Sequence, residues 1–141
     1  MTTPARIADL MADEGLRRAA YRDTVGVCTI GYGHTPASEG EVWTVAQAYD
    51  QLIEDVAAVT AGLDRDLAWW RTLDEVRQDA LANMGFNLGV HGLLGFTHML
   101  APLQAGDFAV ASAQMLLSKW ASQVGDRAAR LAAMIRTGLR P

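Results

Sequence analysis

The chain has 141 residues, of which 50% are hydrophobic and 20% are charged, and its formal net charge is −4. This composition is typical of one soluble globular domain, and a single cysteine excludes a disulfide framework. No stretch reaches the about 20 apolar residues that a membrane span needs, and the first residues lack the apolar core of a signal peptide. We therefore expect no stable membrane insertion and a chain that stays in the cytoplasm unless something else releases it.

The charge is unevenly distributed along the sequence. Residues 39–79 sum to −7 and residues 118–141 sum to +4. A basic end of this kind can dock to an anionic polymer, or it can form internal salt bridges with the acidic segment. Aromatic residues are not interleaved with the basic ones, which argues against nucleic acid as a partner.

The first predicted element is a short amphipathic helix. Thr3 offers a capping hydroxyl, and Pro4 occupies the first helical position. Gly15 is expected to end the helix. The residues on its apolar face follow the spacing i, i+3, i+4, i+7: Ile7, Leu10, Met11 and Glu14.

A β-hairpin is predicted next. The segment Asp23-Thr24-Val25-Gly26 has Asp at the first and Gly at the fourth position of a turn, which favours a type I turn between two strands. The second strand is the run from Val27 to Gly33, where β-branched and aromatic residues are interrupted by glycines. A Pro/Ser/Gly-containing connection follows from Thr35 to Gly40.

Two long helices are predicted after this connection. A capping box of Thr44 and Gln47 begins the first, which runs to about Gly62. Its apolar stripe is Ala48, Leu52, Val56, Val59 and Leu63. Asp74 caps the second, which Gly89 ends. Its inward residues are Val76, Ala80, Leu81, Met84 and Leu88.

Three shorter helices complete the predicted elements. One covers residues 93–100, between Gly92 and Pro102. Asp107 caps the next, which carries Val110, Ala113, Leu117 and Trp120. Asp126 caps the last, which ends at Gly138. The pattern as a whole predicts a mostly helical α+β chain with a small β-hairpin near the amino terminus.

Glu14 is the first candidate for chemistry. It lies on the apolar face of its helix, one turn beyond Leu10. Partial desolvation and the carbonyl end of the helix dipole both disfavour a charged carboxylate there, which suits a general acid. The alternative is a glutamate at the rim of the core that pairs with an arginine.

Asp23 also has two interpretations. An Asp at the start of a turn usually accepts backbone hydrogen bonds. The hairpin, however, returns the chain through Thr29, so Glu14 and Asp23 can stand on opposite walls of a cleft with a hydroxyl between them. Two carboxylates in different environments are what glycoside hydrolysis requires.

These residues belong to a longer pattern. Its most specific part is Glu14-Gly15-Leu16-Arg17, Tyr21-Arg22-Asp23, Gly26 and Thr29-Ile30-Gly31-Tyr32-Gly33-His34. Individually weaker parts are Asn83 to Asn87, Gly95 to Thr97, Trp120, Arg127, Arg130 and Arg136-Thr137-Gly138. This pattern covers nearly the whole chain and resembles the bacteriophage lysozymes, the endolysin muramidases of glycoside hydrolase family 24.

The resemblance implies a lysozyme-like fold in a single domain of residues 1–141. A small β lobe of about residues 16–43 and a larger helical lobe, residues 1–15 with 63–141, are expected on either side of a catalytic cleft. A helix at about residues 44–62 connects them. The connection from His34 to Thr44 is short beside the longest members of the family, so we expect a trimmed small lobe.

The resemblance also implies an activity. Bacteriophage lysozymes hydrolyse the β-1,4 bond between N-acetylmuramic acid and N-acetylglucosamine in peptidoglycan, with inversion, and so lyse the host cell. By this likeness Glu14 is the proton donor, Asp23 the second catalytic carboxylate, and Thr29 the residue that helps to hold the attacking water. The two carboxyls of an inverting enzyme lie about 6.5–9.5 Å apart. No metal or organic cofactor is expected.

Further residues receive roles from the resemblance. The family pairs the histidine that falls at His34 with the aspartate at Asp55, which suggests a buried structural ion pair. Thr35, Phe86 and Gln114 match positions that line the saccharide site, and Phe86 is equally well explained as a core aromatic.

Metal and thiol chemistry are not expected. His91 and His98 lack metal-ligand spacing with each other or with Cys28, so zinc is improbable. Cys28 lies beside Thr29 and has no identifiable partner for nucleophilic catalysis.

Two other functions stay open. A lysozyme-fold module of a phage tail can hold glycan strands without turnover, and a lytic transglycosylase cleaves the same bond with one essential carboxyl and leaves an anhydro-muramic end. The intact Glu14, Asp23 and Thr29 favour hydrolysis. We expect a monomer that binds peptidoglycan glycan strands, waits in the host cytoplasm until a holin opens the membrane, and acts in the periplasm or cell wall.

Overall fold

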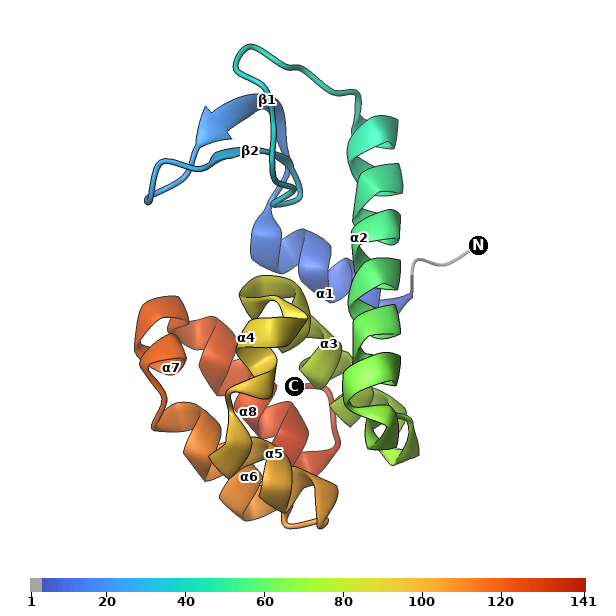
Figure 1. Ribbon diagram of the computed structural model, residues 1–141, viewed down its shortest axis with the longest axis vertical. Helices are drawn as coiled ribbons and strands as arrows, with labels where there is room; N and C mark the ends of the chain where they lie inside the picture. Colours follow the sequence, from blue (N-terminus) through green and yellow to red (C-terminus); the bar gives the residue numbers. More distant parts are fainter. Residues whose placement is uncertain (1–3) are drawn as a thin grey trace. The chain divides into compact units, whose positions relative to one another are not determined.

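The computed structural model describes residues 4–141, and the helix cap expected at Thr3 lies outside that range. The chain divides into two compact units, one ending at Ala58 and the other covering Val59–Pro141. The boundary falls inside one long helix, α2 (Val45–Asp66). The predicted fold class, mostly helical with a small antiparallel sheet, is confirmed (Figure 1). The single-domain organisation and its lobe boundaries stay a prediction.

The first unit contains α1 (Ala5–Glu14), β1 (Arg17–Arg22), β2 (Cys28–Gly31) and the first part of α2. Helix α1 buries Ile7 and Leu10 on one face and ends where the N–H of Gly15 donates to the carbonyl of Met11. The two strands pair antiparallel, with Tyr21 opposite Thr29. The predicted hairpin is therefore confirmed, and the type I geometry of its turn stays a prediction.

Strand β2 is shorter than the predicted run from Val27 to Gly33. The backbone groups of Ile30 and His34 donate to each other's carbonyls and close a tight turn directly after the strand. Gly31 and Gly33 adopt positive φ angles of +68° and +73°, which only glycine adopts without strain. The two glycines thus end the ladder and send the chain toward α2.

Helix α2 begins as predicted and ends later. The backbone N–H of Thr44 donates to the Gln47 side chain, and the N–H of Gln47 donates to the Thr44 hydroxyl, which is the expected capping box. The helix passes Gly62 and continues to Asp66, because Gly62 is buried against Val90 and packing outweighs its low helix propensity.

The second unit holds the large hydrophobic core, whose buried residues run from Leu63 to Ile135. It contains a 3₁₀-helix (Ala68–Thr72), which the sequence did not predict, and α3 (Glu75–Leu88). Asp74 caps α3 by accepting from the N–H of Arg77, and Gly89 follows its end, both as predicted. Every residue from Asp79 to Gly85 is buried, so this part of α3 is covered by protein on all sides.

Shorter helices pack around α3. They are α4 (Val90–Leu94), α5 (Thr97–Gln104), α6 (Phe108–Leu116), α7 (Lys119–Val124) and α8 (Asp126–Thr137). Helix α3 contacts α4 and α8, and α6 contacts α5, α7 and α8 (Figure 1). The indole of Trp120 on α7 donates to Asn87 on α3 over 2.7 Å and fixes α7 on this core.

Several predicted boundaries in the second unit were wrong. The helix expected at 93–100 is two helices, because a turn at Gly95 and Phe96 separates α4 from α5, and Pro102 lies inside α5. The helix after Asp107 ends at Leu116, because Ser118 begins α7 by capping the N–H of Ala121. Asp126 is the first helical residue of α8 and not its cap.

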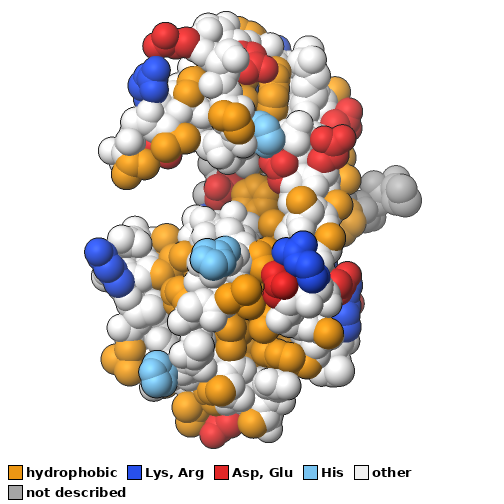
Figure 2. Space-filling view, in the orientation of Figure 1, with side chains coloured by type: hydrophobic (Ala, Val, Ile, Leu, Met, Phe, Trp, Pro, Cys, Tyr) orange, Lys and Arg blue, Asp and Glu red, His pale blue; other side chains and the backbone are white. Residues whose placement is uncertain are grey.

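Of the four apolar residues predicted on the helix after Asp107, only Trp120 is buried, and it lies on α7. Val110 is 44% exposed and Leu117 is 79% exposed, whereas Ala111, Ser112 and Met115 are buried. Figure 2 shows that hydrophobic side chains reach the surface of the molecule on the face drawn.

Charged side chains from the basic and acidic segments form contacts within the second unit. Arg140 from the basic end forms an ion pair with the buried Asp79 of the acidic segment. Arg77 donates to the carbonyls of Ile135 and Arg136 at the end of α8. The Arg140–Asp79 pair supports the internal-salt-bridge interpretation of the charge pattern.

Candidate active site

The candidate catalytic residues all lie in the first unit. Glu14 is the last residue of α1 and is half-buried. Its carboxylate lies against Gly33, because a Cβ placed on Gly33 would be 2.6 Å from Oε1 of Glu14. The missing side chain of Gly33 therefore makes room for the carboxylate and sets it beside the turn that follows β2. Sequence reasoning placed Gly33 in the motif but missed this contact.

Asp23 begins the hairpin turn and is held by the backbone of that turn. Its Oδ1 accepts from the N–H of Val25 over 3.0 Å and from the N–H of Val27 over 2.8 Å. Its own N–H donates to the carbonyl of Val27 over 2.9 Å, and the N–H of Gly26 donates to the carbonyl of Asp23. Asp23 thus performs the turn role expected of an aspartate here. This leaves a second role of the carboxylate open.

Thr29 is buried in β2, with 4% of its surface exposed. Its hydroxyl donates to the carbonyl of Val27 over 3.0 Å. The peptide groups of Val27 therefore anchor both side chains, the N–H holding Asp23 and the carbonyl holding Thr29. A hydroxyl that donates to a carbonyl still has lone pairs with which to accept from a water.

His34 and Asp55 come together as the sequence predicts. Nδ1 of His34 lies 2.7 Å from Oδ2 of Asp55, and Gln51 donates to Oδ1 of the same carboxylate. Their side chains are 22% and 24% exposed, so the pair is partly buried where full burial was expected. A purely structural role for the pair stays a prediction.

The sequence did not predict that an aromatic residue, Trp43, lies beside His34 of this pair. The ring of Trp43 lies 5.6 Å from the His34 ring, and its indole N–H donates to Glu41. Hydrogen bonds from the backbone at Ser38 and from Trp43 hold the pKa of Glu41 below its ordinary value. A tryptophan nine residues after the histidine was the available signal.

The expected saccharide contacts are distributed over both units. Thr35 is exposed in the loop after β2, in the first unit. Phe86 on α3 and Gln114 on α6 are half-buried in the second unit. Their contact with substrate stays a prediction.

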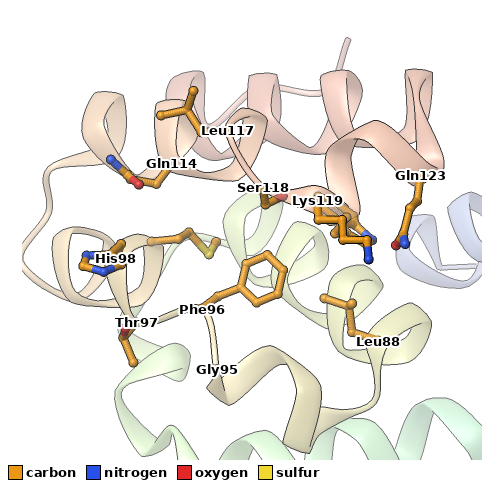
Figure 3. A pocket seen from close by; sticks show the side chains of 12 residues that line it. Leu88, Gly95, Phe96, Thr97, His98, Gln114, Leu117, Ser118, Lys119 and Gln123 are labelled. Atoms are coloured by element: carbon orange, nitrogen blue, oxygen red, sulfur yellow. The ribbon is translucent and has the colours of Figure 1, made fainter.

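Gln114 lines a hollow of about 460 Å³ in the second unit. The ring of Phe96 lies at its middle, with Leu88 and Gln123 on one side and Gln114 on the other (Figure 3). Phe96 meets the ring of Trp120 edge-on, with 6.3 Å between centroids. Sequence reasoning named Gln114 and Trp120 but did not predict that they line one hollow.

The described part of the chain gathers no group of three or more His, Cys, Asp or Glu side chains suited to a metal ion. Cys28 is a half-buried free thiol. No helix within residues 4–141 is long and apolar enough to cross a membrane.

Comparison with known proteins decides the family. The model of the family described as Phage lysozyme matches residues 11–136. The chain belongs to the phage lysozyme family. The predicted resemblance is thereby confirmed, and with it the enzyme class, a glycoside hydrolase of the lysozyme type.

The similar proteins include phage endolysins and a structural protein of a phage. The endolysin of Acyrthosiphon pisum secondary endosymbiont phage 1 is 39% identical over 76% of this chain and 70% of its own length. The endolysin of Salmonella phage P22 is 31% identical over 85% of this chain and 84% of its own length. The pre-baseplate central spike protein Gp5 of Enterobacteria phage T4 is 33% identical over 92% of this chain. The phage lysozyme chain spans only 27% of the length of that spike protein.

Proposed function

We propose that this phage lysozyme is a muramidase that hydrolyses the β-1,4 bond between N-acetylmuramic acid and N-acetylglucosamine of peptidoglycan. Glu14 is the proton donor, Asp23 the second catalytic carboxylate, and Thr29 the residue that helps to hold the attacking water. Family membership and the endolysin names of its relatives support the reaction class.

One observation carries the assignment of residues. Asp23 and Thr29 are fixed on the peptide groups of the same residue, Val27, and Glu14 is seated against Gly33 just beyond the strand that carries Thr29. The backbone of one hairpin thus holds Asp23 and Thr29, and the turn that follows the hairpin lies beside the carboxylate of Glu14. Backbone anchoring of this kind supplies the fixed geometry that acid–base catalysis needs.

The proposed reaction is a single displacement. Glu14 gives its proton to the glycosidic oxygen as the bond from that oxygen to the anomeric carbon breaks. A water attacks the anomeric carbon from the opposite face and passes a proton to Asp23, while Thr29 accepts a hydrogen bond from the water. The sugar is released with inverted configuration, and both products are neutral at the cleaved bond.

We propose that Thr35, Phe86 and Gln114 contact the glycan and that the His34–Asp55 pair stabilises the fold around the motif. The polar or aromatic character of the first group suits saccharide binding. The 2.7 Å contact between His34 and Asp55 joins the loop after β2 to α2 within the first unit, which supports a structural role.

The biological setting follows the relatives named endolysin. We propose that the enzyme acts as a monomer on peptidoglycan in the periplasm or cell wall, lyses the host, and is held in the host cytoplasm until a holin releases it. The similarity to the spike protein Gp5 favours a second setting, in which the same domain acts within a phage particle.

Muropeptide analysis tests the proposal. Purified peptidoglycan is digested with the wild type, with Glu14→Gln and with Glu54→Gln, an exposed glutamate on α2 that serves as the control. We expect products with a reducing-end muramic acid from the wild type and the control and none from Glu14→Gln. Mass spectrometry separates them from anhydro products, which lack one water.

Other product patterns contradict the proposal. Anhydro ends would make the protein a transglycosylase and leave Asp23 without its role. Retained binding to peptidoglycan with no product from the wild type would make it a binding module. Wild-type turnover by Glu14→Gln would remove Glu14 from the proton-donor role.

A further inference from the structure

The turn that carries Asp23 has a specific geometry. The N–H of Gly26 donates to the carbonyl of Asp23 over 3.0 Å, and the N–H of Asp23 donates to the carbonyl of Val27 over 2.9 Å. A turn of this kind, followed by a glycine in the left-handed region, is the common three-residue hairpin loop. Gly26 takes that position with a φ of +84°.

The position of Gly26 determines where the next N–H points. Because Gly26 turns the chain back, the N–H of Val27 reaches Oδ1 of Asp23 at 2.8 Å. The N–H of Val25 reaches the same oxygen at 3.0 Å. Within residues 4–141, no hydrogen bond falls on Oδ2 of Asp23. One carboxylate oxygen is thus fixed by the turn and the other is left for a ligand.

The side chain of Arg22 holds the peptide group between Gly26 and Val27. Nη1 of Arg22 donates to the carbonyl of Gly26 over 2.9 Å, and Nη2 of Arg22 lies 3.7 Å from Glu39. Gly26 is therefore tied through its N–H to Asp23 and through its carbonyl to Arg22.

We propose that Gly26 is a positioning residue for Asp23, which rests on the proposed role of Asp23 in hydrolysis. The left-handed backbone of Gly26 keeps Oδ1 of Asp23 hydrogen-bonded to the N–H groups of Val25 and Val27. The carboxylate then has a single orientation, in which Oδ2 faces the attacking water. Gly26 touches neither substrate nor water and acts only through Asp23.

The surroundings of Gly26 make a clean test possible. A Cβ at this position meets no atom within 4 Å, so a substitution acts through backbone conformation and not through collision. Gly106, between α5 and α6, has the same φ of +84° and the same open space. Gly106→Ala therefore carries the same kind of strain in a turn with no assigned catalytic residue.

The experiment compares Gly26→Ala, Gly26→Asn and Gly106→Ala in peptidoglycan hydrolysis, with thermal unfolding of each. We expect Gly26→Ala to lower kcat by about tenfold or more with little change in KM, since small displacements of a catalytic group are costly. Gly26→Asn should recover most of that loss, because Asn tolerates the left-handed region. Gly106→Ala should lose thermal stability to a similar degree and keep its kcat.

Each result has one meaning. Equal kcat for Gly26→Ala and Gly106→Ala, with an active wild type and an inactive Asp23→Asn, overturns the positioning role and leaves the proposed function standing. A loss at Gly26 that Asn does not recover also overturns it. An Asp23→Asn variant with wild-type turnover overturns the role of Asp23 and this inference with it.

Discussion

The two compact units of the chain achieve order by different means. In the second unit, α3 is buried along Asp79–Gly85 and the shorter helices close around it, so side-chain packing fixes the structure. In the first unit, the turn residues from Thr24 to Val27 are exposed, and hydrogen bonds to the backbone fix Asp23 and Thr29. The comparison indicates that stability resides mainly in packing and that the candidate active site depends on main-chain geometry.

The largest expected effect comes from Asp23→Asn. Asn keeps an oxygen that can accept from the N–H groups of Val25 and Val27, so the turn should survive while the negative charge is lost. We expect kcat to fall by about 10²–10⁴-fold, the range for a positioned acid–base group. Thermal unfolding should hardly change. Full activity would reduce Asp23 to a turn residue.

Leu81→Ala tests the opposite unit. Leu81 on α3 has no exposed surface, and removing a fully buried leucine side chain costs about 2–5 kcal/mol of stability. Leu116→Ala is the control, because Leu116 is 52% exposed. Urea unfolding measures both variants. The folded fraction of Leu81→Ala should keep its kcat, and a selective loss of kcat would contradict the division of roles.

The sequence predicted much of this arrangement, and its failures have physical causes. Glycine and capping residues placed the hairpin, the start of α2 and both ends of α3 correctly. It failed at the helix after Asp107, where the hydrophobic spacing picked out Val110 and Leu117, which are exposed. The cap at Ser118 begins a new helix there, so Trp120 lies on α7.

The candidate site shows the same limit. The motif named Glu14, Asp23 and Thr29 by residue type. The anchoring on Val27 involves peptide groups, which carry no side-chain signal in the sequence. The contact between Glu14 and Gly33 joins two elements, and sequence spacing does not reveal such contacts.

Gly33→Ala should have two effects in the first unit, backbone strain at residue 33 and displacement of the Glu14 carboxylate. The positive φ of +73° makes the alanine unfavourable by about 1–2 kcal/mol. The new Cβ would also displace the Glu14 carboxylate, since Oε1 lies 2.6 Å away. We expect kcat to fall by about tenfold to a hundredfold. Gly106→Ala should show the loss of stability alone, and an unchanged kcat for Gly33→Ala would argue that Glu14 is not the acid.

Asp55→Asn tests whether the histidine pair is structural. It weakens the 2.7 Å contact with His34, and hydrogen bonds to charged groups contribute about 1.5–3 kcal/mol. Because both side chains are partly exposed, we expect a loss near the lower limit, measured by urea unfolding. Glu54→Gln on the same helix is the matched control. A fall in kcat without a change in stability would contradict the structural role.

The smallest expected effect is a pH dependence in the second unit. Hydrogen bonds from Arg71 and Trp70 lower the pKa of Asp64. The carboxylate therefore stabilises the fold fully above the ordinary pKa of an aspartate, about 3.9, and this contribution is lost as pH falls through the lowered value. Asp64→Asn should be slightly less stable than the wild type near neutral pH, and the difference should vanish in acid. If the difference in stability between Asp64→Asn and the wild type persists in acid, it does not come from the charge of the Asp64 carboxylate.

The anchoring of Asp23 and Thr29 on Val27 has a consequence for variation and labelling. Val27 holds the two side chains through its N–H and its carbonyl and not through its own side chain, and the residue is 42% exposed. We therefore expect other residues at this position to keep the two anchoring hydrogen bonds, with proline excluded because it lacks the N–H. The same freedom makes position 27 an attachment point for a fluorescent probe beside the reacting groups that leaves their supports intact.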